Sequence, residues 1–537
     1  MLKNPNYVYG SRDITVPLHL NFGQFILDRM WMHKDRIAQT NGATGETMTY
    51  GEIVQQSMRF AISLSRLGVR KGERIAILSE NRQEFWTAVI GPACVGAIVT
   101  TISTNYVKGE LKHAMNISKP KYVIISPKMH ERHVRTLKSF GFIEKTIIFG
   151  DAGSKSGLYS FDELVLAGGG SEIEIEKFTA VNVNGQNDVL FMVYSSGTTG
   201  LPKGVLLTHY NVIAACCLPV TFDPKQPTLS VGPWYHVMGL VGSITGMASG
   251  RIGVYLDKFD VELYLKTIER YKVVQLTVVP PILVAVCKST STLDLGSVRL
   301  IYSGAAPLHK DTAKAAFEKF PNLRGVFQGY GSSETTLGIT RYTYTQLDIA
   351  KPGSVGLAAP GCVLKIVDIK TRQPLGPNQT GEICAKGALL MKGYIGRARS
   401  EDFDDEDFYR TGDVGYYDED GHFYICDRIK ELIKYKGYQV PPAELEAVLL
   451  QHEAVKDAGV VGIEDRAAGE VPLAFVVRQP GKEVTEQDLK DFVARTLSNP
   501  KHLRGGVRFV TEIPKNPSGK ILRQELRKLA KSRKSKL

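Results

Sequence analysis

Short apolar runs rich in β-branched residues recur along the first two thirds of the chain, and stretches of helical periodicity separate several of them. The runs are typical of buried strands, and they lie at residues 74–78, 97–102, 122–125, 146–149, 189–193, 273–279 and 298–302. Helical spacing is clear at 261–271 and 312–320. This alternation predicts an α/β fold with parallel sheets covered by helices on both faces.

A long stretch without a charged residue, residues 85–107, is long enough to suggest a membrane span. Because it contains two glycines, a proline and an asparagine, we interpret it as a buried helix, opened by Asn81, that runs into a strand. We therefore expect no transmembrane segment. Residues 1–12 also carry no apolar region of the kind that marks a secretory signal.

Small and polar residues follow three of the predicted strands. The segment SSGTTG comes soon after Val193, SGAAP follows Tyr302, and QGYGSSET follows Phe327. Ligands of open parallel sheets bind beyond the carboxyl ends of the strands. We therefore expect these three loops to face one crevice.

The pattern changes near residue 351. Residues 351–426 contain short alternating strands separated by Gly and Asp-Gly turns, which indicates a β-rich subdomain, a distorted barrel. The remainder contains a predicted strand pair between two helices. One helix starts at Pro441-Pro442, and the other is capped by Thr485 with Asp488 three residues later. The sequence thus predicts a large N-terminal domain over 1–427 and a separable, small α+β domain over 428–537.

Basic residues gather at the C-terminus of the 537-residue chain, whose formal net charge is +12. From residue 515 onward nine Lys or Arg accompany a single acid. A nucleic-acid-binding tail is one interpretation, but no aromatic residue interleaves these charges, so a solvated basic end is favoured and no nucleic-acid partner is expected. The final Ser535-Lys536-Leu537 matches a peroxisomal address, with a chance tripeptide as the alternative. We expect a peroxisomal import receptor as a partner and a peroxisomal location.

The overall composition, 43% hydrophobic and 23% charged residues, is that of a soluble globular protein. The seven cysteines lie mostly in apolar runs, and none forms a C-x-x-C pair. Buried thiols in a reducing compartment are therefore favoured over disulfides or a metal site.

A glycine-rich stretch at 194–204, YSSGTTGLPKG, follows the strand predicted at 189–193. Glycines allow backbone N–H groups to converge, hydroxyls add further donors, and a lysine adds charge, so the stretch suits phosphate oxygens. It lacks the spacing of the common P-loop, and an ordinary hairpin is the alternative. The candidate phosphate-binding residues are Ser195, Ser196, Gly197, Thr198, Thr199, Gly200 and Lys203.

The same stretch resembles the signature loop of the adenylate-forming superfamily, which includes acyl-CoA synthetases, coumarate-CoA ligases and beetle luciferases. Further blocks resemble the ordered motifs of that superfamily, at 234–239, 303–307 with 328–336, 409–413, and 427–437 with 514–520. The resemblance implies that ATP activates a carboxylic acid as an acyl adenylate, which is then transferred to a thiol. The implied cofactors are ATP, Mg²⁺ and coenzyme A.

The resemblance assigns roles to charged residues around the nucleotide. Lys520, in PKNPSGK, resembles the mobile catalytic lysine of adenylation, and Glu334, in GSSET, resembles the carboxylate that holds Mg²⁺. Asp413 resembles the acid that accepts the ribose hydroxyls, with Arg428 as its basic companion. Each of these side chains could otherwise be an ordinary surface charge.

The resemblance also implies an adenine site, phosphate donors and an acyl site. Tyr330 offers a ring for stacking, and Thr335 or Thr336 is the expected phosphate donor beside Thr199. His236, in PWYHVMG, would lie between ATP and the acyl carboxylate and orient the latter, although a histidine in an apolar run is usually a core residue. The adenine-site residues would be Gly304, Ala305, Ala306, Pro307, Gln328, Gly329 and Tyr330, and the candidate pocket walls are Val237, Met238 and Leu240.

The segment Asp427-Arg428-Ile429-Lys430 resembles the hinge of the family, near 428–430. The resemblance implies a mobile C-terminal domain that rotates after adenylation and presents the stretch near Lys434 to CoA. Lys430 would be the pivot and Lys434 a residue of the second half-reaction.

The C-terminal third resembles insect luciferases and luciferase-like acyl-CoA synthetases. Three residues depart from the beetle luciferase pattern: Ala215 replaces an arginine, Met238 an aromatic residue and Leu337 a serine. An apolar wall favours a hydrocarbon, so we expect a fatty acyl-CoA synthetase for medium to long chains. The alternatives are a luciferase, a coumarate-type ligase and a non-catalytic binding protein.

Overall fold

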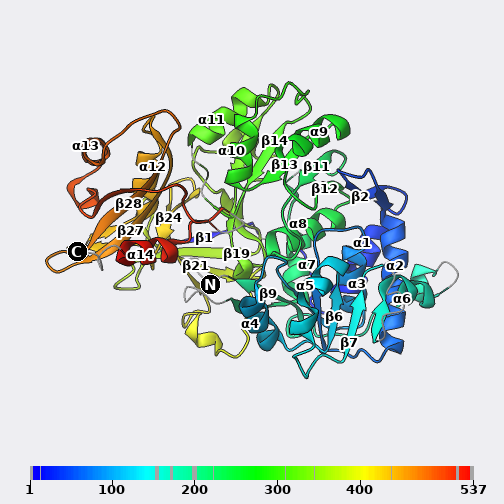
Figure 1. The fold of residues 1–537 in the computed structure, drawn as a ribbon. Helices are drawn as coiled ribbons and strands as arrows, with labels where there is room; N and C mark the ends of the chain where they lie inside the picture. The colour runs from blue at the N-terminus through cyan, green and yellow to red at the C-terminus, as the bar shows by residue number, and fades with distance from the viewer. Residues whose placement is uncertain are drawn as a thin grey trace.

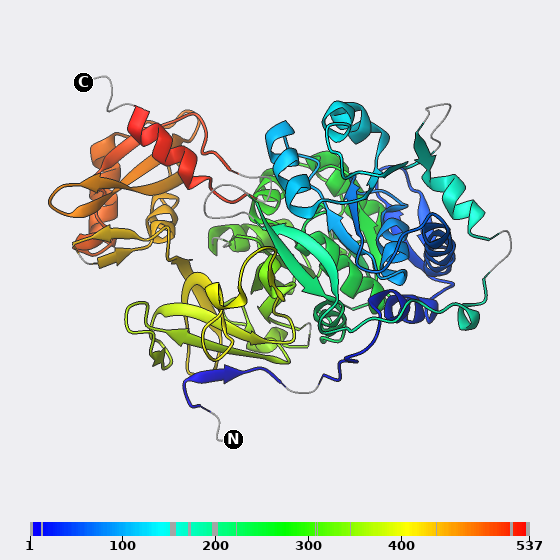
Figure 2. The same ribbon diagram turned by 90° about the horizontal axis from the view of Figure 1, so that it is seen from below.

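The structure is a computed structural model that describes residues 4–11, 14–150, 157–169, 173–195, 202–221, 223–306, 308, 310–343, 345–436, 438–515 and 519–532. Two large sheets with their helices form most of the body, and the C-terminal region, coloured orange to red, stands at one side of it (Figure 1, Figure 2). The predicted α/β fold, with a large N-terminal part and a smaller α+β C-terminal part, is confirmed.

The first sheet has eight strands, and the part from β9 to β8 is parallel, as predicted. Its other end is antiparallel, because β9 turns back through the glycine-rich stretch into β10. In spatial order the strands are β22 (Gly393–Tyr394), β10 (Lys203–Thr208), β9 (Val189–Ser195), β5 (Ile98–Thr101), β4 (Arg74–Leu78), β6 (Tyr122–Ile125), β7 (Lys145–Ile148) and β8 (Leu158–Ser160).

The second sheet has seven strands, parallel except for the pair formed by β2 and β3 near the N-terminus. That pair joins the sheet beside β12, which lies about two hundred residues further along the chain. In order the strands are β15 (Gly325–Gln328), β14 (Leu300–Ser303), β13 (Gln275–Val278), β11 (Pro227–Ser230), β12 (Ile252–Tyr255), β2 (Ile37–Asn41) and β3 (Thr47–Thr49).

Helices cover the faces of these sheets. α2 begins with a capping box, in which Thr49 Oγ1 accepts from Glu52 N (3.2 Å) while Glu52 accepts from Thr49 N (2.7 Å). The apolar face of α2 packs into the largest core, where Tyr50 and Trp86 are almost fully buried. The helices are α1 (Phe22–Trp31), α2 (Tyr50–Arg66), α3 (Phe85–Cys94), α4 (Lys108–Ser118), α5 (Pro127–Leu137), α6 (Phe161–Ala167), α7 (His209–Cys216), α8 (Val237–Ala248), α9 (Val261–Tyr271), α10 (Pro280–Lys288) and α11 (Lys310–Lys319).

The uncharged stretch forms α3 and then β5, as predicted, but Asn81 does not open the helix. α3 starts at Phe85, and the Asn81 amide instead connects two loops of the second sheet. Its Nδ2 donates to Gly232 O (3.1 Å) in the loop after β11 and to Leu256 O (3.3 Å) after β12, and its Oδ1 accepts from Trp234 N (2.8 Å). The Asn81 amide carries both a donor and an acceptor, and here it forms tertiary hydrogen bonds instead of capping a helix.

The β-rich region forms an antiparallel sheet, and the N-terminal strand β1 joins it beside β19 (Figure 2). β22 leaves this region and pairs with β10 of the first sheet. The strands of the antiparallel sheet are β1 (Tyr7–Tyr9), β19 (Cys362–Val367), β20 (Pro374–Leu375), β21 (Gly381–Gly387), β23 (Tyr409–Tyr417) and β24 (Phe423–Arg428), and a small third sheet contains β16 (Tyr330–Gly331), β17 (Gly338–Arg341) and β18 (Leu357–Ala358).

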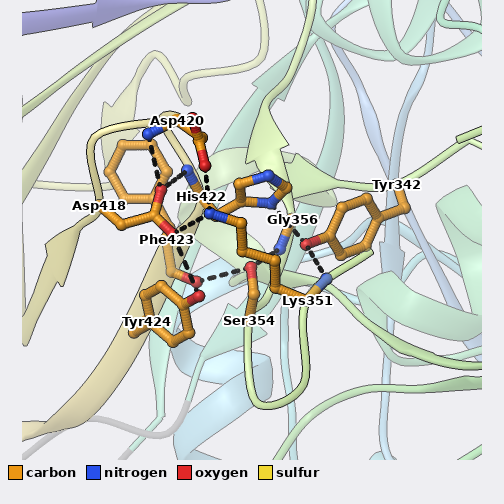
Figure 3. Close-up of polar contacts among 9 residues, drawn as sticks. All are labelled: Tyr342, Lys351, Ser354, Gly356, Asp418, Asp420, His422, Phe423 and Tyr424. Carbon is orange, nitrogen blue, oxygen red and sulfur yellow. Dashed lines mark hydrogen bonds and ion pairs between the residues drawn. The ribbon is translucent and has the colours of Figure 1, made fainter. Parts of the chain in front are cut away.

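A polar cluster fixes the turn between β23 and β24 against the segment that follows β17 (Figure 3). Lys351 Nζ pairs with Asp418 (2.8 Å) and Asp420 (2.5 Å). The Tyr342 hydroxyl accepts from Lys351 N (3.2 Å) and lies within hydrogen-bonding distance of His422 Nδ1 (2.7 Å). The hairpin that carries Asp413 is thereby tied to the neighbourhood of the second sheet.

The C-terminal region is an α+β unit whose predicted helices are confirmed. Pro441 precedes α12, and Thr485 Oγ1 accepts from Asp488 N (3.2 Å) at the start of α13. The elements are β25 (Ile433–Tyr435), β26 (Tyr438–Val440), α12 (Pro442–Leu449), β27 (Val455–Asp465), β28 (Gly469–Arg478), α13 (Glu486–Thr496), β29 (Gly506–Phe509) and α14 (Arg523–Ser532).

Among the described residues, no helix has both the length and the apolar character needed to cross a membrane. All seven cysteines are free thiols, as predicted.

Candidate active site

The loops that follow β14 and β15 lie side by side, as the sequence predicts. Leu308 N, beyond β14, donates to Gln328 Oε1 at the end of β15 (2.8 Å). Ala305 has a φ of +68°, which L-residues adopt rarely and which is typical of strained functional loops. The predicted adenine residues are therefore neighbours in the structure, except Pro307, which lies outside the described residues.

Asp413 and Arg428 face each other on β23 and β24, because the two strands pair in register at this point. Arg428 Nε lies 2.7 Å from Asp413 Oδ1, and the Asp413 side chain is only 8% exposed. Tyr330 donates its hydroxyl to Asp413 Oδ2 (2.8 Å), a contact that the sequence did not predict. Since a carboxylate offers about four lone-pair sites, Asp413 can still accept from the hydroxyls of a sugar.

Lys520 lies beside this pair. The neighbouring Gly519 packs against α10: a Cβ added there would lie 2.2 Å from Pro281 Cγ, so no larger residue fits. Burial is the main cause, and the positive charge of Arg428 a smaller one, that lowers the pKa of Lys520 to about 8, while Asp413 acts in the opposite direction. The structure thus brings a desolvated ammonium group to the carboxylate and guanidinium of the predicted ribose site.

Glu334 is buried in a short turn after β16, and Tyr394 of β22 donates its hydroxyl to Glu334 Oε1 (2.7 Å). Met391 N also donates to the Glu334 backbone oxygen (2.8 Å). Lys203 Nζ, at the start of β10, lies 4.7 Å from the centre of the Tyr394 ring. The Glu334 carboxylate and the Lys203 ammonium group, both predicted to lie at the phosphates, therefore contact the same side chain, that of Tyr394.

The carboxylate oxygens of Glu334 fit a Mg²⁺ ion that the protein would bind together with the phosphates of a nucleotide. Mg²⁺ prefers oxygen ligands, and in nucleotide sites it uses one or two carboxylates together with phosphates and water. Within the described part of the chain, no group of three or more His, Cys, Asp or Glu forms a complete cation site. A single carboxylate, that of Glu334, fits the arrangement in which the nucleotide supplies the other ligands.

The two threonines after Glu334 are not placed as phosphate donors, contrary to expectation. Thr335 Oγ1 lies within hydrogen-bonding distance of Ser332 O (3.1 Å) and Leu337 O (2.9 Å), and it accepts from Ser332 N. Thr336, fully buried with a φ of +60°, donates to Leu389 O (2.5 Å). A hydroxyl has a single proton, and in both residues a backbone carbonyl takes it.

His236 precedes the first turn of α8, and its ring lies against Tyr235 with centroids 4.6 Å apart. Burial lowers the pKa of His236 to about 4, so the imidazole is neutral at pH 7 and can orient a carboxylate by donating an N–H. Met238 of the same turn reaches Gly304, since a Cβ there would lie 3.4 Å from Met238 Cε. The histidine turn is therefore adjacent to the nucleotide loops.

Two residues expected near the substrate are buried in the core instead. Ala215 of α7 is 1% exposed and Leu240 of α8 is fully buried, and both belong to the largest hydrophobic cluster. A side chain that solvent does not reach does not line an open pocket. Val237, Met238 and Leu337 are only partly buried and remain candidate walls.

The hinge segment lies between the end of β24 at Arg428 and the start of β25 at Ile433. Asp427 Oδ2 accepts from Ala443 N in the first turn of α12 (2.9 Å) and so links β24 to the C-terminal region. Lys430 lies close enough to contribute to the lowered pKa of Lys203. Lys434 is exposed, in contrast to Lys520.

Part of the predicted phosphate site falls on residues outside the described ones. Ser195 ends β9 and Lys203 begins β10. The residues between them that were predicted to bind phosphate, and that the structure does not describe, are Ser196, Gly197, Thr198, Thr199 and Gly200.

Tyr394 was not predicted from the sequence. It is separated from Glu334 by 60 residues and from Lys203 by a longer segment, and its Gly-Tyr context resembles an ordinary turn. No local pattern could have indicated that β22 pairs with β10.

Comparison with known proteins agrees with this geometry. The family model of the AMP-binding enzyme matches residues 28–395, and that of the AMP-binding enzyme C-terminal domain matches residues 444–520. A luciferin 4-monooxygenase of Nipponoluciola cruciata is 40% identical over 92% of this chain and 91% of its own length. A 4-coumarate–CoA ligase 3 of Arabidopsis thaliana is 37% identical over 96% and 92%. The crystal structure of ATP-bound MatB from Rhodopseudomonas palustris superposes with a TM-score of 0.84 at 27% identity, over 95% of this chain and 99% of that one.

Proposed function

The chain belongs to the AMP-binding enzyme family, and we propose that within it the protein is an ATP-dependent acid–thiol ligase. The acid is a fatty acid of medium to long chain, activated as acyl-AMP and then transferred to CoA. The observation that carries the first half-reaction is the position of Lys520, a desolvated cation beside the Asp413–Arg428 pair.

The chemistry is an in-line displacement at the α-phosphorus of ATP. An oxygen of the fatty carboxylate forms the new P–O bond, and the bond to the bridging oxygen of pyrophosphate breaks with its electron pair. Negative charge builds up on the phosphoryl oxygens, so a preorganised ammonium group lowers the barrier. In this proposal Lys520 supplies that charge, Asp413 and Arg428 hold the nucleotide, and neutral His236 orients the acid.

Mg²⁺, held by Glu334 and the phosphates, would neutralise charge on the pyrophosphate. This assignment is supported by the oxygen-donor chemistry of the buried Glu334 carboxylate. The second half-reaction requires that Lys520 withdraw and that CoA reach the acyl adenylate. The proposed pivot is Lys430, and the exposed Lys434 is proposed to face CoA after rotation.

The proposed acid is apolar because the partly buried Met238 and Leu337 are candidate walls of the acyl site. A luciferin monooxygenase and a coumarate-type ligase are the second candidates, since a luciferin 4-monooxygenase and a 4-coumarate–CoA ligase are both similar to this chain. Intact Lys520, Glu334, Asp413 and Arg428 argue against a non-catalytic binding protein.

Incubation of purified protein with ATP, Mg²⁺, CoA and a panel of acids, while AMP, thioester and photons are measured, tests the proposal. We expect AMP and thioester from fatty acids without light. Light from a luciferin would favour the monooxygenase, and thioester from coumarate alone would favour the coumarate ligase. Absence of acid-dependent exchange of labelled pyrophosphate into ATP would contradict adenylation itself.

The rate of adenylation is expected to fall as pH rises through about 8. Lys520 acts as a cation, its pKa is lowered to about 8, and the charge is therefore present below that pH and lost above it. The measurement is kcat/KM for pyrophosphate exchange across the alkaline range, because kcat/KM reports the free enzyme. In the Lys520→Arg variant the fall should shift to higher pH, since a guanidinium remains charged. An unshifted fall would assign the titration to another group.

We also propose that Ser535-Lys536-Leu537 directs the protein to peroxisomes. Deletion of these three residues is expected to leave pyrophosphate exchange unchanged and to leave a fluorescent fusion in the cytosol. The location of the two fusions is measured by microscopy of cells that express them. The matched control is a protein with one alanine added after Leu537. Peroxisomal import of the deleted form would refute the address.

A further inference from the structure

Tyr394 contacts two charged groups of the proposed phosphate site at once. Its hydroxyl donates to Glu334 Oε1 (2.7 Å), and both side chains belong to residues less than 9% exposed. Lys203 Nζ lies over its ring, 4.7 Å from the centre. Neither contact is local in sequence, so both exist only because of the tertiary fold.

The backbone holds this arrangement in place. β22 pairs with β10 so that Tyr394 lies opposite Val205, two residues from Lys203. On its other side the loop before β22 bonds to the Glu334 turn, through Met391 N to Glu334 O (2.8 Å). Tyr394 thus stands between the strand that leaves the glycine-rich stretch and the turn that carries the carboxylate.

We propose that Tyr394 is a positioning residue for the phosphate end of the site: its hydroxyl orients the Glu334 carboxylate toward the metal–nucleotide complex, and its ring holds Lys203 beside the same phosphates. This inference rests on the proposed function, because that function places the nucleotide phosphates at Glu334, and Lys203 is predicted from the sequence to bind the same phosphates. No role of this kind follows from the sequence motifs.

The hydroxyl half of the proposal follows from the coordination chemistry. Mg²⁺ accepts little deviation from octahedral geometry. Since the Tyr394 hydroxyl bonds to Oε1, it restricts rotation of the Glu334 carboxylate. Groups that orient a metal ligand typically contribute 10–100-fold in metal affinity, which sets the expected size of the effect.

The ring half follows from the charges around Lys203. Burial lowers the pKa of Lys203, and Arg397 and Lys430 act in the same direction, whereas Asp402 and Glu334 act in the opposite direction, so the ammonium lies among charges of both signs. Arg397 itself lies 5.5 Å from the Tyr394 ring centre and pairs with Asp402 (3.2 Å). The electron-rich face of the ring attracts Lys203 without neutralising it, unlike a carboxylate partner. The ring therefore holds the Lys203 side chain in place without forming an ion pair with it.

The test separates the hydroxyl from the ring. Tyr394→Phe removes the hydroxyl and keeps the ring face, whereas Tyr394→pentafluorophenylalanine keeps the ring shape and removes its negative face. Mn²⁺ affinity is measured by electron paramagnetic resonance, with α,β-methylene-ATP as the bound nucleotide. The KM for pyrophosphate is measured in the exchange reaction.

We expect Tyr394→Phe to weaken Mn²⁺ binding about tenfold or more and to change the KM for pyrophosphate less than about twofold. We expect the fluorinated variant to raise that KM a further fewfold, in line with the strength of a cation–π contact. The matched control is Tyr417→Phe, which removes another buried tyrosine hydroxyl, one that donates to Leu375 O (3.4 Å) in the same sheet as Asp413. It should leave both quantities at wild-type values.

Mn²⁺ affinity of Tyr394→Phe equal to that of Tyr417→Phe would overturn the hydroxyl role. An identical KM for pyrophosphate in the two Tyr394 variants would overturn the ring role. Mn²⁺ binding needs no acid and no turnover, so its outcome is separate from that of the proposed function. A wild-type protein that binds Mn²⁺ with nucleotide yet shows no acid-dependent exchange would refute the ligase reaction alone.

Discussion

Lys520→Ala is expected to lower acid-dependent pyrophosphate exchange about a thousandfold, a loss of about 4 kcal/mol of transition-state stabilisation. The ammonium lies in a desolvated site beside Asp413 and Arg428, where a charge acts more strongly than it would in water. Transfer of a supplied acyl adenylate to CoA should change less than about threefold, since that step follows withdrawal of the lysine. Both half-reactions are measured on the same preparation.

The matched control for this experiment is Lys515→Ala. Lys515 belongs to the same segment but pairs with Asp457 within the C-terminal region (2.6 Å). Its removal should leave both half-reactions unchanged, because an exposed ion pair contributes little. Equal loss of adenylation and of transfer in Lys520→Ala would contradict the assigned role and indicate a general defect instead.

Asp413→Asn is expected to lower kcat/KM for ATP about a hundredfold, or about 2.7 kcal/mol. The amide cannot replace the ion pair with Arg428 (2.7 Å), and it offers fewer acceptor sites for ribose while Tyr330 still occupies one (2.8 Å). The guanidinium would then lack its partner, so thermal unfolding should also occur at a lower temperature. Pyrophosphate exchange at varied ATP, together with a melting curve, measures both effects.

Asp368→Asn provides the comparison for this second experiment. Asp368 belongs to the same sheet region but caps an exposed turn, where it accepts from Lys370 N (2.9 Å) and Thr371 N (2.7 Å). We expect a small loss of stability and wild-type use of ATP. An unchanged KM for ATP in Asp413→Asn would remove Asp413 from the nucleotide site.

The sequence predicted those strands and helices that are determined by residues close to one another in the chain. Apolar runs indicated β4, β5, β6, β7 and β9 of the first sheet and β13 and β14 of the second, and the capping pattern of Thr485 and Asp488 indicated the start of α13. The assignment of Asn81 as the opener of α3 was wrong because its amide satisfies two loops instead. A side chain that can cap a helix can equally well form hydrogen bonds with backbone groups far away in the sequence.

The site followed from the sequence in part. The structure places Asp413, Arg428 and Lys520 together, as the motifs predict. It assigns the hydroxyls of Thr335 and Thr336 to backbone carbonyls, and neither residue type nor spacing reveals that choice.

Burial was a further point that the sequence did not decide. Ala215 and Leu240 were expected near substrate on the basis of residue type, yet both are enclosed in the core. Which face of a helix turns toward a ligand depends on packing against other helices, and that information is spread over the whole chain.

By itself the sequence determined many of the strands and helices, the starts of α12 and α13, and the presence of residues suited to phosphate and ribose. These features depend on neighbours a few residues away, so a local pattern is sufficient to encode them. The tertiary structure alone decided that β22 pairs with β10 and that Tyr394 joins Lys203 to Glu334. Such contacts join segments far apart in the chain, and they form only where the packing of complete sheets brings the side chains within a few ångströms of one another.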